Sequence, residues 1–328
     1  MNIVVGPNAS GKTNLLEAIL VLCRGSSYRA RDIDLVQNDQ EWARLDSTDE
    51  QNQTRVVKLQ KQGEKIDKTF EIDEQTRKRL NFAQTIPIVL FEPNQLQSIT
   101  TSPSQRRLFI DDLLSQIDPE YSKQQRNYER VLAQRNALLK QKPQDAAQQL
   151  FVWNLRLSEF GAVIANKRQA IIETINAKFT NNYQEIAGSK DVIALAYESE
   201  CQLDQYGSSL LKRLEATISE DLQRGFTGNG PHRDDLLITI NNRPLLQAAS
   251  RGETRTILLS LKIQELLMLE QSRGLRPLLL FDDVFSELDG VRRKSLTRFL
   301  RNYQTFITTT DADVIAHNFA QTSKLIML

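Results

Sequence analysis

Residues 6–13 have the types and spacing of a phosphate-binding loop. They fit the pattern G-x-x-x-x-G-K-[ST] at every position, with Lys12 and Thr13 as the last two residues. In such a loop the glycines let backbone N–H groups turn toward phosphate oxygens, the lysine reaches the β- and γ-phosphates, and the hydroxyl binds Mg²⁺. We therefore predict that Lys12 is catalytic and that Thr13 is a magnesium ligand. The predicted nucleotide contacts are Gly6, Pro7, Asn8, Ala9, Ser10, Gly11, Lys12, Thr13 and Asn14.

Two adjacent carboxylates, Asp282 and Asp283, form a second candidate site. They follow the apolar residues 278–281, which predict a buried strand. In an open α/β sheet, ligands bind at the carboxyl ends of the strands. The first carboxylate of such a pair usually holds Mg²⁺ through water, which we predict for Asp282. The second orients and polarises the attacking water, so Asp283 is the candidate base. The alternative is a solvated strand end, although such ends rarely carry a sequence like that of residues 282–289.

The elements around these residues are those that a nucleotide site needs. An apolar strand at residues 2–5 precedes the loop, and leucines at helical spacing follow it, which argues against a chance glycine-rich turn. Residues 43–72 predict a β-meander, and residues 86–91 predict another buried strand. A hairpin turn is expected at Asn241-Asn242 and a helix from Arg255 to about Glu270.

Residues 104–187 are predicted to be helical. Apolar residues lie on one face over 119–142, and again at steps of three and four over about ten turns to residue 186, which corresponds to a helix of roughly 50 Å. Two long helices joined by a short turn at Pro143 predict an antiparallel arm, with two ordinary helices of a bundle as the alternative.

The distance along the chain between loop and carboxylates narrows the class of nucleotide-binding protein. Lys12 and Asp282 are 270 residues apart, and the gap holds the predicted meander and arm. Small GTPases and kinases place these elements closer together, so the gap favours an α/β fold of the ABC type, a P-loop ATPase head with an inserted helical hairpin. The expected division is a first part of the head at 1–103, the arm at 104–187 and the rest of the head at 188–328.

Residues 250–256 form a candidate second phosphate site, because Ser250 and Gly252 precede a predicted helix N-terminus. In ABC ATPases the corresponding segment binds the γ-phosphate of the nucleotide held by the partner subunit. The loop glutamine Gln95, and His232 and Arg233 in a turn-rich stretch with Gly225, Gly228 and Gly230, are less specific candidates. Gln95 could sense Mg²⁺ or be a solvated residue, and His232 and Arg233 suit a contact or a hinge better than catalysis.

Several segments resemble motifs of the RecF family of bacterial DNA repair ATPases, in order along nearly the whole chain. The similar segments are the phosphate loop at 6–18, 104–111 with Arg106 and Arg107, 130–140, the GPHRDD segment at 230–235, the signature at 249–256, and the Walker B and D-loop segment at 282–289. The last of these places Asp289 among the nucleotide contacts.

The resemblance implies a head-and-arm protein that uses ATP and Mg²⁺, forms an ATP-dependent homodimer and hydrolyses ATP slowly. It implies binding to gapped or junction DNA and work with RecR and RecO type mediator proteins. Three features depart from the family pattern. Family members usually carry a further segment before the first strand, Thr254 stands where Gln or Lys is more usual, and the switch histidine of ABC proteins is replaced by a threonine-rich segment with Thr310 and Asp311 as candidates.

The net charge of the chain limits how it could bind DNA. The net charge is only +1, so DNA contact requires a local cluster of Lys and Arg, backbone groups or an assembled dimer. The arm residues Arg126, Arg130, Arg135 and Lys140 could form such a cluster, or could simply lie on the solvent-exposed face of a helix. Arg106 and Arg107 could likewise contact phosphate or a neighbouring acid.

The remaining features predict a cytoplasmic protein, to which the resemblance adds association with the nucleoid, and they leave two other functions open. No apolar run approaches the ~18 residues of a membrane span. The first residues lack a basic region followed by an apolar stretch, so we do not expect them to act as a signal peptide. Cys23 and Cys201 suit small buried residues. A transporter ATPase subunit would share the loop and carboxylates but predicts an L-S-G-G-Q segment and a switch histidine. A nucleotide-binding interaction module with impaired ATPase is the other alternative.

Overall fold

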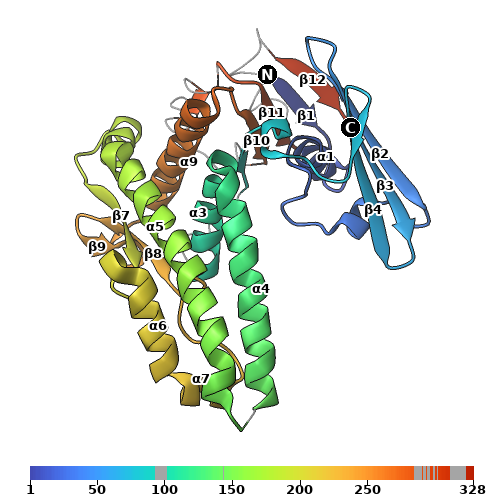
Figure 1. Ribbon diagram of the computed structural model, residues 1–328. Helices are drawn as coiled ribbons and strands as arrows, with labels where there is room; N and C mark the ends of the chain where they lie inside the picture. The colour runs from blue at the N-terminus through green and yellow to red at the C-terminus, as the bar shows by residue number, and fades with distance from the viewer. Residues whose placement is uncertain are drawn as a thin grey trace. The chain divides into compact units, whose positions relative to one another are not determined.

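The computed structural model describes residues 1–92, 102–142, 144–283, 302–310 and 323–328, together with 290, 293, 296, 297 and 300 (Figure 1). The chain forms two compact units. The first comprises Met1–Pro93 and Leu266–Leu328, and the second comprises Asn94–Glu265.

A parallel sheet forms the centre of the first unit. Its strand order is β12-β1-β11-β10-β6, and every neighbouring pair is parallel. The carboxyl ends of all five strands therefore meet at one edge. The sheet confirms the α/β fold class. Its strands are β1 (Asn2–Val5), β6 (Ile88–Phe91), β10 (Leu278–Asp282), β11 (Thr305–Thr309) and β12 (Lys324–Met327).

Helix α1 (Lys12–Arg24) directly follows the phosphate loop and covers the sheet. Its residues Leu16, Leu20 and Cys23 are buried against apolar residues of β6 and β10. The helix ends at Gly25, which has a φ of 84° and donates its N–H to the Val21 carbonyl, as expected for a left-handed C-terminal cap. Packing of α1 on the sheet thus fixes the position of the loop relative to the ends of β6 and β10.

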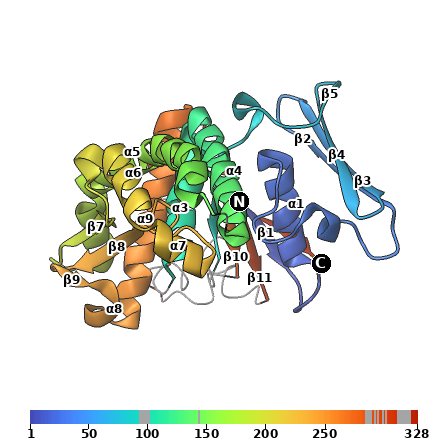
Figure 2. The ribbon, with the colours of Figure 1, turned by 60° about the horizontal axis from the view of Figure 1, so that its bottom comes forward.

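The predicted β-meander is present in the first unit as an antiparallel sheet (Figure 2). Val57 and Phe70 of this sheet pack against Val21 and Leu22 on α1. Its strands are β2 (Trp42–Thr48), β3 (Thr54–Gln62), β4 (Lys65–Ile72) and β5 (Gln75–Arg77), and two 3-10 turns, η1 (Asp32–Leu35) and η2 (Phe82–Gln84), flank it.

The second unit is built on a long helical hairpin. Helix α3 (Pro103–Ile117) leads into α4 (Pro119–Gln141), and α5 (Ala146–Ala187) runs back beside α4 (Figure 1). Helix α5 has 42 residues, about 63 Å at the usual helical rise, so it is longer than the sequence predicted. Apolar residues at steps of three and four lie buried along it, among them Leu157, Ile164 and Phe179.

Residues 188–265, which the sequence analysis assigned to the head, pack with this hairpin. A three-stranded antiparallel sheet of β7 (Ile193–Glu198), β8 (Asp235–Ile240) and β9 (Arg243–Pro244) contacts α5 and α3. The remaining elements are η3 (Leu203–Gln205), α6 (Tyr206–Ala216), α7 (Ile218–Arg224), α8 (Leu245–Ala248) and α9 (Arg251–Arg273), which continues into the first unit. The Asn241-Asn242 turn between β8 and β9 has positive φ at both residues, as its sequence predicted.

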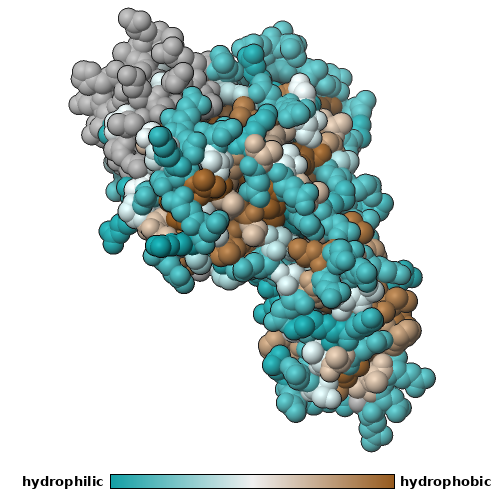
Figure 3. All heavy atoms as spheres, turned by 90° about the vertical axis from the view of Figure 1, so that its left-hand side faces the viewer, coloured by the Kyte–Doolittle hydropathy of each residue, from teal (hydrophilic) through white to brown (hydrophobic). Residues whose placement is uncertain are grey.

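Hydrophilic side chains cover most of the face shown in Figure 3, and apolar side chains form separate patches on it. Within the described part of the second unit, exposed apolar residues occur close together at the start of α5, where Phe151, Val152 and Leu155 are exposed. None of the described helices combines the length and the apolar character that crossing a membrane requires.

Candidate nucleotide-binding site

The backbone of the phosphate loop has the curled shape that its sequence predicts. Ala9 and Gly11 have φ values of 66° and 98°, and the Ser10 N–H donates to the Pro7 carbonyl. A left-handed φ at Ala9 is unfavourable for a residue with a Cβ, so the loop holds a local strain of the kind found at functional sites. Because α1 begins at Lys12, the N–H groups of its first turn lie at the mouth of the loop.

Lys12 holds its ammonium group inside the loop. Its Nζ donates to the carbonyl oxygens of Gly6 and Pro7, both at 2.8 Å, and the residue is only 8% exposed. The Ser10 hydroxyl is buried and has no hydrogen-bond partner among the described residues. A buried cation and an unused hydroxyl in a curled loop are the groups that a bound phosphate would engage, so the residues present fit a nucleotide.

Thr13 and Asp282 meet across the sheet edge. The Thr13 hydroxyl donates to Asp282 Oδ1 at 3.1 Å, although 269 residues separate them. A hydroxyl and a carboxylate in contact are the oxygen ligands that Mg²⁺ takes in nucleotide sites, directly or through water. Asp283 follows at once and has a φ of 54°, so its backbone departs from that of β10. The structure thus brings the loop, Asp282 and Asp283 to one edge of the sheet.

Two side chains at this edge of the sheet were not predicted from the sequence. Glu92 follows β6, whose register with β10 puts it next to Asp282. Burial raises the pKa of the Glu92 carboxyl, and the nearby charge of Asp282 raises it further. Tyr28 packs against the core cluster of α1, and its buried hydroxyl has no partner among the described residues. Burial raises the pKa of Tyr28, as do the charges of Glu92 and Asp282.

The chain between α1 and the meander is tied to Glu17, which is 5% exposed. Its carboxylate accepts hydrogen bonds from Ser27 Oγ at 2.7 Å and from Arg29 Nε at 3.2 Å. These contacts hold the segment that carries Tyr28. The proximity of Glu92 to Asp282 follows only from the order of the strands, and that of Tyr28 only from the path of this segment. No local sequence pattern could have predicted either residue.

Ser250 and Gly252 lie at the start of α9 in the second unit. The Ser250 hydroxyl accepts from the Glu253 N–H at 3.3 Å, and the Glu253 carboxylate accepts from the Ser250 N–H at 2.7 Å. This capping box starts the helix at Arg251, four residues earlier than predicted. Hydrogen bonds from Ser250 also lower the pKa of Glu253. The predicted second phosphate site is therefore a capped helix N-terminus with Gly252 in its first turn.

The RecF-like motif residues of the second unit bind one another. Arg106 forms a two-point ion pair with Asp235, at 2.9 and 2.6 Å, and Arg107 donates to the Asp234 carbonyl at 2.7 Å. The hydrogen bond from Arg106 holds the pKa of Asp235 below its usual value, although burial alone would raise it. The Asp234 carboxylate accepts from three hydroxyls, those of Tyr197, Ser199 and Tyr206. Of the two interpretations of Arg106, the neighbouring acid is the one that the structure shows.

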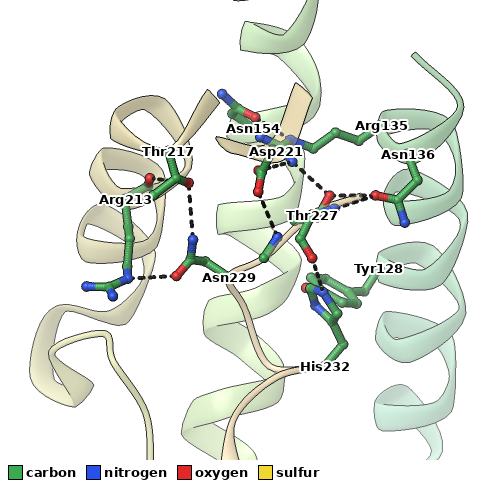
Figure 4. A network of polar contacts seen from close by, with 11 residues as sticks. Tyr128, Arg135, Asn136, Asn154, Arg213, Thr217, Asp221, Thr227, Asn229 and His232 are labelled. Atoms are coloured by element: carbon green, nitrogen blue, oxygen red, sulfur yellow. Dashed lines mark hydrogen bonds and ion pairs between the residues drawn. The ribbon is translucent and has the colours of Figure 1, made fainter. Parts of the chain in front are cut away.

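A second polar network includes Arg135, which is completely buried (Figure 4). Its guanidinium donates to Asn154 Oδ1 and Asp221 Oδ2, both at 2.7 Å, and to Thr227 Oγ1 at 2.8 Å. The prediction that Arg135 could contact DNA is therefore wrong, because the side chain points into the second unit. Only Arg126, Arg130 and Lys140 of the predicted cluster are exposed.

His232 belongs to the same network and is neutral. Its Nε2 lies 3.1 Å from the Thr227 carbonyl, which only accepts, so Nε2 carries the proton. Nδ1 then accepts from the Tyr128 hydroxyl at 2.6 Å. Burial lowers the pKa of His232 to about 4. This arrangement fits a structural contact, as the sequence analysis favoured over catalysis.

Three predicted site residues lie outside the described part of the chain, namely Gln95, Asp289 and Asp311, and so does Pro143 of the predicted turn. Thr310, the other candidate at the switch position, is exposed at the end of β11. The hydroxyl that contacts Asp282 comes instead from Thr308, two residues earlier, at 2.8 Å.

The chain matches the family described as RecF/RecN/SMC N terminal domain over residues 1–327. It is 35% identical to the DNA replication and repair protein RecF of Natranaerobius thermophilus, covering 94% of this chain and 84% of that protein. The same identity holds for RecF of Streptococcus equi subsp. zooepidemicus, with 95% and 86% covered.

Two solved structures are also similar. One is the recombination mediator protein RecF-ATPrS in the RecFOR pathway, with a TM-score of 0.85 and 30% identity over 95% of this chain and 87% of that chain. The other is the recombination mediator protein RecF-ATP in the RecFOR pathway, with a TM-score of 0.82 and 30% identity over 94% of this chain and 86% of that chain.

Proposed function

Because this chain belongs to the RecF family, we propose that it is an ATP-dependent DNA-binding protein of recombinational gap repair and replication restart that hydrolyses ATP slowly. The observation that carries the proposal is the contact of Thr13 with Asp282 beside the buried Lys12 ammonium. That grouping provides a cation for the phosphates and oxygen ligands for a metal ion at one sheet edge. Membership of this family speaks against the transporter alternative.

Each residue of the site has a distinct proposed task. Lys12 leaves the carbonyls of Gly6 and Pro7 and binds the β- and γ-phosphates, while the loop N–H groups hold the other phosphate oxygens. Thr13 would hold Mg²⁺ directly and Asp282 through water, and the ion would neutralise charge on the phosphate oxygens. Asp283 orients the attacking water and accepts its proton.

Asp283→Asn is expected to lower kcat for ATP hydrolysis by about 10²-fold, because an amide orients water but does not accept its proton. ATP binding should change little, since Lys12 and the loop are untouched. Steady-state phosphate release and equilibrium binding of a fluorescent ATP analogue measure the two quantities. Wild-type turnover in this variant would remove Asp283 from the proposed role of base.

The second phosphate site at Ser250 and Gly252 is proposed to act in a dimer. The N-terminus of α9 presents a positive dipole end to a phosphate, while the N–H groups of Ser250 and Glu253 are engaged in the capping box. By the logic of ABC ATPases, that phosphate is the γ-phosphate of ATP bound to the partner subunit. ATP would then hold two copies together, and hydrolysis would release them.

The exposed cations of α4 are the proposed DNA contact. Arg126, Arg130 and Lys140 are exposed on one face of the helix and span about 21 Å. No ion pair joins any of them to another described residue. With a net charge of +1 the chain needs a local cluster of cations of this kind to contact DNA phosphates. The proposed partners beyond DNA are RecR and RecO type mediators, in the cytoplasm and at the nucleoid.

Replacing Arg126, Arg130 and Lys140 together by Gln should weaken DNA binding at low salt and lower the slope of log K against log salt by about three. Fluorescence anisotropy with gapped and fully duplex DNA measures both. Arg156→Gln is the matched control, since Arg156 is exposed on α5 but pairs with Glu159. An unchanged slope in the triple variant would place the DNA contact elsewhere.

A further inference from the structure

Thr308 lies on the middle strand of the parallel sheet and is completely buried. It sits on β11, between β1 and β10, and its register partner on β10 is Asp282. We propose that Thr308 is a positioning residue for ATP hydrolysis, whose hydroxyl fixes the Asp282 carboxylate and the backbone of Asp283 together. The inference rests on the proposed ATPase function and adds to it a residue outside the phosphate loop and the carboxylate pair.

The Thr308 hydroxyl both donates and accepts a hydrogen bond at this site. Oγ1 lies 2.8 Å from Asp282 Oδ1 and 3.3 Å from the Phe281 carbonyl, and it lies 3.1 Å from the Asp283 nitrogen. A hydroxyl has one hydrogen, which goes to the nearer and charged acceptor, Asp282. Its lone pair accepts the Asp283 N–H. One side chain thus forms hydrogen bonds with the two consecutive residues Asp282 and Asp283.

Asp283 needs this support because of its backbone. Its φ of 54° is left-handed, a conformation that is unfavourable for a residue with a Cβ. Strained residues of this kind persist at functional sites when neighbouring contacts hold them. The N–H bond to Thr308 is such a contact, and it sets the direction in which the Asp283 side chain leaves the strand.

Asp282 is held from two sides. Its Oδ1 accepts from Thr13 on α1 and from Thr308 on β11. The two hydroxyls fix the plane of the carboxylate, and such second contacts to a metal-binding group usually matter for metal affinity. Next along β11, the Thr309 carbonyl accepts the Gly6 N–H at 3.4 Å, so the same strand also meets the start of the phosphate loop.

Thr308→Val tests the proposal, because valine keeps the shape and branching of threonine and removes the hydroxyl. Thr308→Ser keeps the hydroxyl and is the rescue variant. Thr305→Val is the matched control, since Thr305 is also completely buried on β11 but bonds the Tyr303 carbonyl at the other end of the strand. Thermal unfolding shows whether each variant is folded.

The first readout is Mn²⁺ affinity in the presence of a non-hydrolysable ATP analogue, from the electron paramagnetic resonance signal of free Mn²⁺. Thr308→Val should bind Mn²⁺ about 10-fold more weakly. The second readout separates kcat from KM. The kcat for ATP hydrolysis should fall about 10-fold, the effect expected for losing a hydrogen bond to a charged group, while KM for ATP should stay within about twofold.

Wild-type values for Thr308→Ser and Thr305→Val support the proposal. Equal losses in both valine variants, or no rescue by serine, would show that Thr308 only stabilises the strand and would overturn it. An active wild type with an equally active, equally Mn²⁺-retaining Thr308→Val overturns the inference and leaves the proposed function intact. A wild type that neither holds Mn²⁺ with nucleotide nor hydrolyses ATP defeats both.

Discussion

Lys12→Met should lower kcat for ATP hydrolysis by about 10³-fold, the upper range for removing one group that stabilises transition-state charge. The Lys12 ammonium is the one charge that the structure holds inside the phosphate loop, in contact with the Gly6 and Pro7 carbonyls. Methionine has a similar length and volume, so the buried stem of the side chain keeps its packing. Phosphate release under saturating ATP measures the effect.

The control is Lys58→Met, on the exposed face of β3, where Lys58 pairs with Glu71. This variant should turn over ATP at the wild-type rate. Thermal unfolding of Lys12→Met should stay near that of the wild type, which separates a catalytic loss from misfolding. Turnover of a folded Lys12→Met within a few-fold of wild type would contradict the proposed role of Lys12.

Arg135→Met should destabilise the second unit by about 3–5 kcal/mol, because it leaves the Asp221 carboxylate buried without its cation. Asp221 and Arg135 are both completely buried, and the same guanidinium also holds Asn154 and Thr227 (Figure 4). Loss of the side chain therefore affects α4, α5, α7 and the segment that leads to His232 at once.

Urea unfolding followed by tryptophan fluorescence measures this effect. The chain has two tryptophans, so a Trp42→Phe background leaves Trp153 on α5 as the sole reporter of the second unit. Arg130→Met, on the exposed face of the same helix, is the control and should leave the unfolding midpoint unchanged. A stable Arg135→Met protein with weakened DNA binding would reverse this assignment of the two arginines.

The sequence was most informative where function depends on consecutive residues. The phosphate loop, the Asp282-Asp283 pair and the Asn241-Asn242 turn each depend on local backbone conformation, which local residue types determine. Individual strands of the central sheet and the meander followed from short apolar runs and their lengths, but the parallel pairing of those strands did not. The capping box at Ser250 and Glu253, three residues apart, has a local sequence signature that was missed, because the helix was expected to begin only at Arg255.

The rest depends on contacts between distant parts of the chain. Thr308 and Glu92 reach Asp282 only because β10 lies between β6 and β11, and strand order is not written in any one segment. Arg135 occupies a helix with other cations, and nothing near it in the sequence indicates that its partner is Asp221, 86 residues away. Residues 188–265 looked like a return to the head because β7 and β8 are strands, yet they form their own sheet against α5.

We propose that ATP bound at the phosphate loop joins two copies of this chain through Ser250. Light scattering on the wild type, with ATP and Mg²⁺ and without, tests it most directly, with Ser250→Arg and Lys12→Met beside it. ATP should double the mass of the wild type, Ser250→Arg should bind ATP but stay monomeric, and Lys12→Met should not respond. Wild-type protein that binds ATP and remains monomeric, or a Ser250→Arg variant that dimerises normally, would contradict it.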